Sequence, residues 1–297
     1  KTTDGGETWS VSPTGVSVDL HGVMFIGNPE GGAVGAAGTI LTSDDAGGSW
    51  SQQNGVISQD TTWVFADSPF QVTGHVTVAS GVTLTIEPGV TVKFDSGKVL
   101  EVEGTLVARG TATSTVTFTS SAASPAAGDW GYIKFTGSSV PASFDGNGDY
   151  SSGSILEHCV VEYGGAYAST PTNLFVIHGA SYINYCTVRH NQGNAAIAGS
   201  LFPDWSSSDN YPVRITNSII TQNSGAAIAA VRNATITGNT ITYNSTSGWD
   251  GAIYTGGNTA ASYITISNNT IAHNSSDGIR GRVEGGTTFT ITQNTIT

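Results

Sequence analysis

Apolar and polar residues alternate strictly over short stretches of the chain from about Thr61 onward. The clearest stretches are Val76–Val78, Val82–Ile86 and Val90–Phe94, and Ser-Gly or Pro-Gly pairs separate them. A period of two with turn residues at both ends predicts short β-strands that each bury one side. The connections between these stretches are too short for helical crossovers and contain no Asn-Gly hairpin signal. We therefore expect a solenoid, in which each strand pairs with the strand one coil away.

A repeat with the pattern Ile-x-x-Asn-x-Ile-x-x-Asn becomes visible after residue 150. Its six copies follow one another at uneven spacing, which fits β-helix coils with loops of variable length. The first apolar positions are Leu156, Ile183, Ile215, Ile236, Ile266 and Ile291. The apolar positions five further along are Val161, Val188, Ile220, Ile241, Ile271 and Ile296.

Polar side chains occupy the fourth and ninth positions of this repeat. The fourth position holds Cys159, Cys186, Ser218, Asn239, Asn269 and Asn294. The ninth position holds Gly164, Asn191, Asn223, Asn244 and Asn274. Asn tolerates the left-handed conformation at a corner, and stacked Asn side chains can hydrogen-bond along the solenoid axis. We therefore expect two structural ladders of these residues at the corners of the coils.

The two cysteines share one ladder position in consecutive coils. Stacked residues in neighbouring strands lie ~4.8 Å apart, so a disulfide needs only a small adjustment of the backbone. We favour a pair of buried thiols, Cys159 and Cys186, over a bond between them.

The repeat resembles the PbH1 repeats of pectate-lyase-like and NosD-like proteins. The stretches Val76–Thr119 and Gly128–Phe135 are also similar to the first coils of many secreted bacterial β-helix proteins. The resemblance covers residues 61–297 and implies an all-β, right-handed parallel β-helix. Proteins of this kind include polysaccharide lyases, glycoside hydrolases, epimerases, adhesins and surface fibres, so function has to be argued from a site.

Residues 1–55 carry a different motif in two copies, Thr2–Trp9 and Ser43–Trp50, and the distance between the copies matches one four-stranded propeller blade. Each copy has an Asp before a Gly turn and a Trp that can pack beneath a hairpin. The motif resembles the Asp-box of BNR-type β-propellers, in particular the blades of photosystem-assembly-factor-like proteins. Between the copies, Leu20–Phe25 and Ala33–Leu41 are expected strands. We interpret this region as one blade of a β-propeller, with further blades preceding Lys1.

Composition restricts the classes of partner. Charged residues make up only 11% of the chain, and 22 Asp and Glu against 10 Lys and Arg give a formal net charge of -12. Nucleic acids and anionic membrane surfaces attract basic proteins, so neither is an expected partner. No apolar run is long enough to span a bilayer as a helix, so we expect no membrane insertion of this segment. The expected location is extracellular or at the cell surface, as a segment of a larger protein.

Exposed aromatic residues in loops are the candidates for carbohydrate binding, because sugar rings stack on aromatic faces beside carboxylates and amides. The longest late insertion runs from Gly199 to Pro212. Together with one later corner, it supplies the candidate set Phe202, Asp204, Trp205, Asp209, Tyr211 and Trp249.

Carboxylates suggest one candidate metal site and one ion pair. Asp250 and Asp277 precede Gly at the same corner in neighbouring coils, so together they could bind Ca²⁺, although Asp-Gly is also a common turn. We expect no other cofactor. Glu162 and Arg189 share an outward position one coil apart and are expected to form a surface ion pair. The sequence contains no compact cluster of Asp and Glu of the kind found in lyase sites.

The sequence favours a structural or binding protein: a stalk, adhesin or filament component that presents its surface to glycans or to other copies of itself. The competing hypothesis is an enzyme, a polysaccharide lyase or glycoside hydrolase of β-helix type. A third hypothesis is an ice-binding surface, because outward Thr residues flank the first apolar column. These residues are Thr235, Thr265 and Thr290 on one side, and Thr216, Thr237, Ser267 and Thr292 on the other.

Overall fold

The computed structural model describes 11 segments of the chain. They are residues 20–25, 31–35, 40–43, 51–165, 175–179, 182–199, 213–230, 233–245, 251–256, 263–282 and 286–297. Within these segments nearly all regular structure is β-strand, with one short 3₁₀ helix, η2 (Phe65–Asp67).

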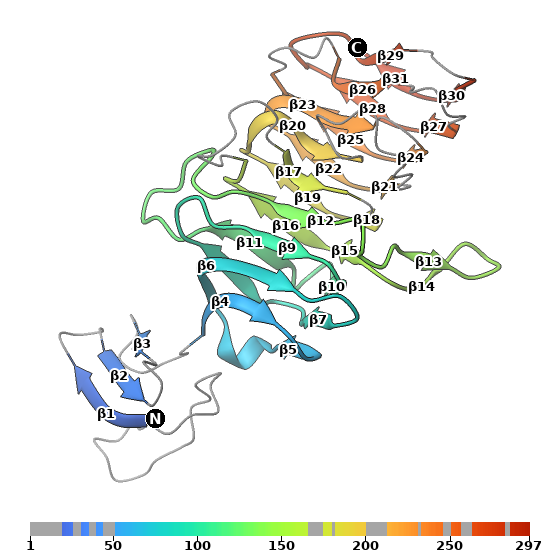
Figure 1. Ribbon diagram of the computed structural model, residues 1–297. Coiled ribbons are helices and arrows are strands. Elements are labelled where there is room, and N and C mark those ends of the chain that lie inside the picture. The colour runs from blue at the N-terminus through green and yellow to red at the C-terminus, as the bar shows by residue number, and fades with distance from the viewer. Residues whose placement is uncertain are drawn as a thin grey trace.

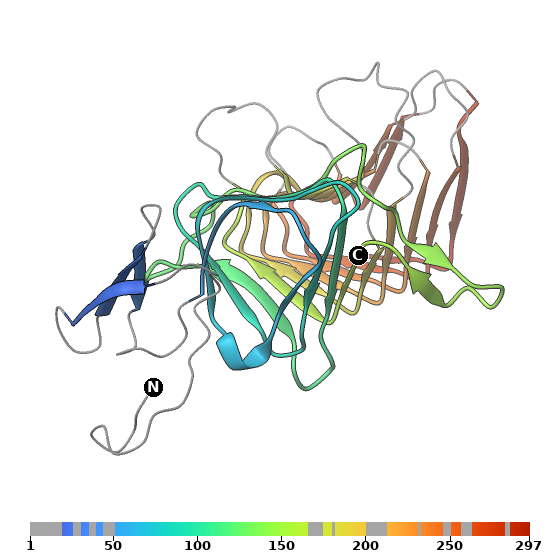
Figure 2. The same ribbon diagram turned by 60° about the horizontal axis from the view of Figure 1, so that its bottom comes forward.

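The described strands from Gln52 onward, apart from one hairpin, form a parallel β-helix with three faces (Figures 1 and 2). The first face contains β5 (Thr61–Trp63), β7 (Thr83–Ile86), β10 (Thr105–Arg109), β15 (Ile155–Glu157), β18 (Tyr182–Asn184), β21 (Val213–Thr216), β24 (Ala234–Thr237), β27 (Tyr263–Ser267) and β30 (Thr288–Thr292). The second face contains β8 (Thr91–Phe94), β11 (Val116–Ser120), β16 (Cys159–Glu162), β19 (Thr187–Arg189), β22 (Ile219–Thr221), β25 (Thr240–Thr242), β28 (Thr270–Ala272) and β31 (Thr295–Ile296). The third face contains β9 (Leu100–Val102), β12 (Ile133–Phe135), β17 (Phe175–His178), β20 (Gln192–Ala198), β23 (Ser224–Ala230), β26 (Ile253–Gly256) and β29 (Ile279–Arg282).

The register confirms the alignment of the repeat. Leu156 pairs with Ile183, Ile183 with Ile215, and the same column continues to Ile291. The second apolar column runs in the same way along the second face from Val161 to Ile296. Both columns point into one continuous hydrophobic core as far as Ile266 and Ile271, and their last members, Ile291 and Ile296, are about half exposed. Each earlier coil therefore buries its apolar side against the next.

The parallel stacking begins earlier than the expected residue 61. Strand β4 (Gln52–Ile57) pairs in parallel with β6 (Phe70–Val78), and β6 in turn pairs with both β8 and β9. Most residues of β4 are partly or fully exposed, so this strand lacks the alternation that marks the later ones. Its place in the solenoid was therefore not visible in the sequence.

The described residues before Gln52 form a small antiparallel sheet of β1 (Leu20–Phe25), β2 (Gly31–Gly35) and β3 (Ile40–Ser43). The expected strand Ala33–Leu41 is wrong, because β2 and β3 are two strands that run in opposite directions. Glycines at positions 35 and 38 are typical strand interruptions. Nearly all of both Asp-box motifs lies outside the described residues, so the propeller blade stays a prediction.

The corners of the coils require a left-handed backbone, but not at the ladder asparagines. Positive φ occurs at the residue before each ladder position, for example Tyr243 (φ 56) before Asn244 and His273 (φ 55) before Asn274. The expected left-handed conformation of the ladder residues themselves is therefore wrong. A ladder side chain has to point into the coil to reach backbone groups, whereas the residue before it turns the chain and points outward.

The ladder asparagines satisfy buried backbone groups between coils. Asn239 Nδ2 donates to Ile215 O at 3.0 Å and to Asn269 Oδ1 at 3.0 Å. Its Oδ1 accepts a bond from Ser218 N at 2.9 Å. The second ladder repeats this arrangement, with Asn223 Nδ2 donating to Asn244 Oδ1 at 2.9 Å. Each buried amide therefore links one coil to both of its neighbours.

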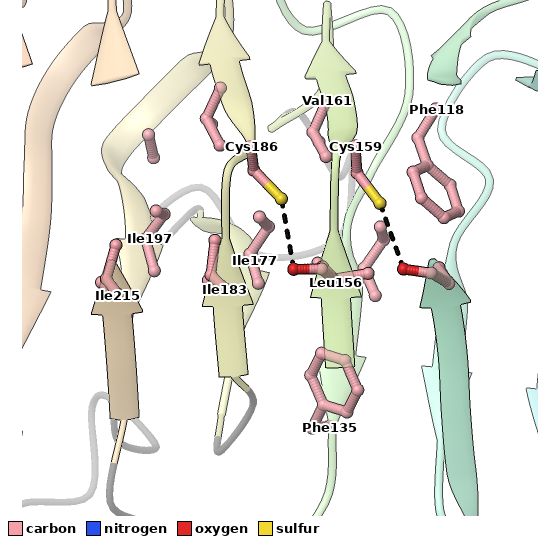
Figure 3. Close-up of a cluster of buried hydrophobic side chains, with 14 of the residues drawn as sticks. Phe118, Phe135, Leu156, Cys159, Val161, Ile177, Ile183, Cys186, Ile197 and Ile215 are labelled. Carbon is pink, nitrogen blue, oxygen red and sulfur yellow. Dashed lines mark hydrogen bonds between the residues drawn. The ribbon is translucent and has the colours of Figure 1, made fainter. Parts of the chain in front are cut away.

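Both cysteines take the place of an amide in the first ladder (Figure 3). Cys186 Sγ donates to Leu156 O at 3.2 Å, and Cys159 Sγ donates to Ala108 O at 3.4 Å. The two thiols are buried, and no disulfide joins them. Burial, and then the neighbouring Cys186, raise the pKa of the Cys159 thiol well above its usual 9.0.

We expect Asn239→Ala to destabilise the fold strongly. The substitution leaves Ser218 N and Ile215 O buried without partners, and each such group costs about 1–3 kcal/mol. Denaturant unfolding followed by circular dichroism measures the loss. The control Asn147→Ala removes an exposed asparagine and should shift the midpoint little; equal shifts for both variants would contradict a stabilising ladder.

The buried thiols predict a specific pH dependence. Because the pKa of Cys159 is raised in the folded state, the unfolded chain releases this proton first as the pH rises. The free energy of unfolding should therefore fall above about pH 9, and a thiol reagent should label native protein only slowly at pH 8. The double variant Cys159→Ser/Cys186→Ser is the control, since Ser218 already occupies a ladder position. If the free energy of unfolding falls with pH as steeply in that variant as in the unaltered protein, the buried thiols are not the cause of the fall.

Candidate functional site

Most of the residues expected to bind a ligand lie outside the described part of the chain. This applies to Phe202, Asp204, Trp205, Asp209, Tyr211, Trp249 and Asp250. Asp277 is described, and its backbone carbonyl accepts a hydrogen bond from Ala252 N at 2.7 Å. Among the described residues no three His, Cys, Asp or Glu side chains lie close enough to hold a metal ion.

Three isolated ion pairs join charged side chains of the described strands. Arg189 Nε lies 2.9 Å from Glu162 Oε2, as expected from their shared outward position. The Arg189 side chain is 43% exposed, so this pair contributes at most about 1 kcal/mol. Lys134 pairs similarly with Glu101 across the third face. These pairs stabilise the surface locally. The described segments contain no group of three or more converging carboxylates.

A hairpin leaves the solenoid between β12 and β15 and projects beside the first face (Figure 1). It consists of β13 (Ser143–Phe144) and β14 (Tyr150–Ser152). The Asp145 carboxylate shapes its tip, because Oδ1 accepts bonds from the backbone N–H groups of Asn147 and Asp149, both at 2.9 Å. The hairpin therefore has a defined conformation at both its strands and its turn.

Aromatic side chains hold the hairpin against the first face. Tyr182 of β18 contacts Phe144 edge to face at 5.1 Å and Tyr150 in a stacked arrangement at 6.4 Å between ring centroids. Two guanidinium groups extend the stack: Arg109 lies 5.3 Å from the Tyr150 centroid, and Arg214 lies 4.2 Å from that of Phe144. Five side chains from four distant parts of the sequence thus form one assembly.

Hydrogen bonds between side chains of the first face lie beside this aromatic assembly. Glu157 Oε2 accepts bonds from Arg109, and its Oε1 accepts one from Asn184 Nδ2 at 2.9 Å. Asn184 Oδ1 accepts a further bond from Thr216 Oγ1 at 2.7 Å. Burial is the largest influence on the Tyr150 hydroxyl and raises its pKa above the usual value. These side-chain hydrogen bonds link four neighbouring strands of the first face beside the aromatic assembly.

A hollow of about 470 Å³ lies between the hairpin and the first face. It is lined by Ala142, Phe144, Tyr182, Val213, Arg214, Asn233, Ala234, Thr235, Tyr263 and Thr265. The lining combines aromatic rings, hydroxyl and amide groups and one charge, which is the combination that small polar ligands with apolar faces require. Tyr263 is 68% exposed and free to meet a ligand. We call this hollow the hairpin groove.

The repeat in the sequence indicates one wall of this groove. Tyr182, Arg214, Thr235 and Thr265 each come directly before the first apolar residue of the repeat. Their register places them in one outward column, and each pairs with the next. The repeat itself does not indicate that Phe144 would reach this column.

The Thr rows considered for ice binding are aligned on the first face. Thr235 pairs with Thr265, and Thr265 with Thr290. In the adjacent row the Thr237 and Ser267 hydroxyls bond each other at 3.1 Å. The two threonine rows therefore adjoin the hairpin groove, which Thr235 and Thr265 also line.

No helix in the described segments is long and apolar enough to cross a membrane.

Comparison with known proteins supports the fold. Residues 55–173 match the family model described as a pectate-lyase like beta helix domain, and residues 172–297 match the right handed beta helix region. No curated protein matches the chain, and no solved structure does. Together with the parallel register, the two matches confirm the right-handed parallel β-helix. They do not extend to the residues with the Asp-box motifs.

We expect Tyr182→Ala to loosen the hairpin, because Tyr182 joins both of its aromatic residues to the sheet. Amide hydrogens of β13 and β14 should exchange with deuterium about tenfold faster, while those of β24 stay protected. Tyr185→Ala is the matched control, since Tyr185 is half exposed and stacks on His158 at a corner instead. Unchanged exchange in Tyr182→Ala would show that other contacts hold the hairpin.

Proposed function

We propose that this β-helix is a glycan-binding structural module of an extracellular or cell-surface protein, and that the hairpin groove is its sugar site. The observation that carries the proposal is the exposed aromatic and polar lining of the groove on a rigid face. Sugar rings have apolar faces and hydroxyl edges, so Tyr263 and Phe144 suit the first and Asn233 and the Thr hydroxyls suit the second.

The matched pectate-lyase-like domain favours a carbohydrate-related role. Coils stacked in register give a stiff rod, which suits a stalk, an adhesin or a filament component that contacts glycans or other copies of itself. In this proposal the segment before the rod is a propeller blade that joins it to further domains. In the same proposal Trp205 and Trp249 are further candidates for contacts with sugars, and Asp250 with Asp277 is the candidate Ca²⁺ site.

Binding without turnover is the favoured form of this function. β-Helix lyases and glycosidases need converging carboxylates, whereas no three His, Cys, Asp or Glu side chains gather in the described segments. Incubation with polyuronates, with Ca²⁺ or with a chelator, tests this point through the ultraviolet absorbance of unsaturated ends and the release of reducing sugar. Chelator-sensitive turnover would establish a lyase and overturn a purely binding role.

Tyr263→Ala tests the groove as the sugar site. A glycan array identifies an oligosaccharide ligand, and calorimetry then measures its affinity for each variant. Loss of the exposed ring should weaken binding roughly fivefold or more. Tyr243→Ala is the matched control, because Tyr243 is a 59% exposed tyrosine on another edge of the solenoid. Equal affinities of Tyr263→Ala and the unaltered protein would exclude this groove.

A further inference from the structure

We propose that Arg214 makes the hairpin groove selective for glycans that carry an anionic group, either a carboxylate or a sulfate ester. This inference rests on the proposed function, because it names the ligand class of the same site. Among the described residues that line the groove, Arg214 is the one that carries a charge. Every other polar group in the lining is an uncharged hydroxyl or amide, so a single positive charge faces the bound ligand.

The position of the guanidinium is fixed before a ligand arrives. Arg214 leaves β21 in the outward column between Tyr182 and Thr235. Its Cζ atom lies 4.2 Å from the Phe144 centroid and 5.2 Å from the Tyr182 centroid, so two rings hold it in cation–π contact. The hairpin therefore does more than border the groove: its Phe144 ring positions the Arg214 guanidinium.

The hydrogen-bonding capacity of Arg214 is largely unused. Its Nε is buried and has no partner among the described residues. Its Nη1 donates to Gly148 O of the hairpin, but at 3.4 Å this bond is long. A buried N–H without a partner costs free energy that a suitable acceptor would recover. The guanidinium thus lacks the acceptors that its five N–H groups can use.

The carboxylates around the groove do not supply these acceptors. Arg109 and Arg189 each form an ion pair, but within the described segments Arg214 forms none. Glu157 is engaged by Arg109 and by an amide, and Asp145 accepts two backbone N–H groups of the hairpin. Within the described segments Arg214 therefore has no carboxylate partner, and an anionic ligand group would supply the missing counter-charge.

An anionic oxygen group fits this arrangement in chemistry and in geometry. Carboxylate and sulfate oxygens accept two parallel N–H bonds from a guanidinium, and such charge-assisted bonds are about twice as strong as neutral ones. Arg holds this geometry better than Lys because its fork is planar and rigid. The overall charge of -12 repels anions at long range, so selection has to come from this local contact.

The test compares three tetrasaccharides, which are built from galacturonate units, from sulfated galactose units and from uncharged galactose units. Calorimetry at low and high salt should show that the unaltered protein binds at least one acidic probe about tenfold or more tighter than the uncharged one. The acidic probe that binds tighter identifies the group as carboxylate or sulfate. This preference should weaken as ionic strength rises.

Arg214→Met should remove the preference and leave the affinity for uncharged galactose within about twofold, because Met keeps apolar contact with the rings. Arg214→Lys should retain only part of the preference. Arg189→Met is the matched control, since it removes an arginine from the second face and should leave all three affinities unchanged. Deuterium exchange of β13 and β14 reports whether the hairpin stays docked in each variant.

Three results would overturn the inference. The first is equal binding of acidic and uncharged probes by the unaltered protein, which leaves the proposed glycan site standing. The second is an acidic preference that persists in Arg214→Met with a docked hairpin. The third is the absence of binding to any glycan, on the array or in calorimetry, which overturns the proposed function as well.

Discussion

The constraint on which this structure depends is that each coil has to satisfy its buried backbone groups through the coil above and the coil below. Strand pairing does this along the flat faces, but a corner breaks the pairing and exposes N–H and C=O groups to the core. The ladder amides answer that need: Asn239 reaches the backbone of one neighbouring coil and the amide of the other. Where a thiol replaces the amide, as at Cys186, it still donates to the same kind of carbonyl.

The same constraint fixes the coil register, and the register determines what the surface can do. An outward residue in one coil lies on the equivalent residue of the next, so single residues become columns. On the first face the column through Tyr182, Arg214 and Thr265 therefore joins an aromatic ring, a charge and a hydroxyl across successive coils. An insertion between coils leaves the core undisturbed, which is why the hairpin can leave the solenoid and still pack on that column.

Much of the fold was predictable because its signals are local and periodic. Alternation marks strands with one buried face, and the repeat locates the columns that enter the core, as from Leu156 to Ile266. Strand β4 was not predicted because none of its residues is fully buried. The left-handed corner residues were placed one position too late because a ladder amide has to point inward. The groove was not predictable, since it depends on Phe144 meeting a column that starts much later in the chain, at Tyr182, and no period links the two.

Rigidity and selectivity have one origin in this molecule. A flexible loop that presented an arginine would lose side-chain and backbone freedom when it bound, and this loss would weaken the affinity. Arg214 instead projects from a strand paired on both sides, and two rings hold its guanidinium. The ordering is completed when the solenoid folds, so a ligand meets a charge already in place. An acidic chain can thus use the stacking of its coils to hold one positive charge where the sequence as a whole would repel an anion.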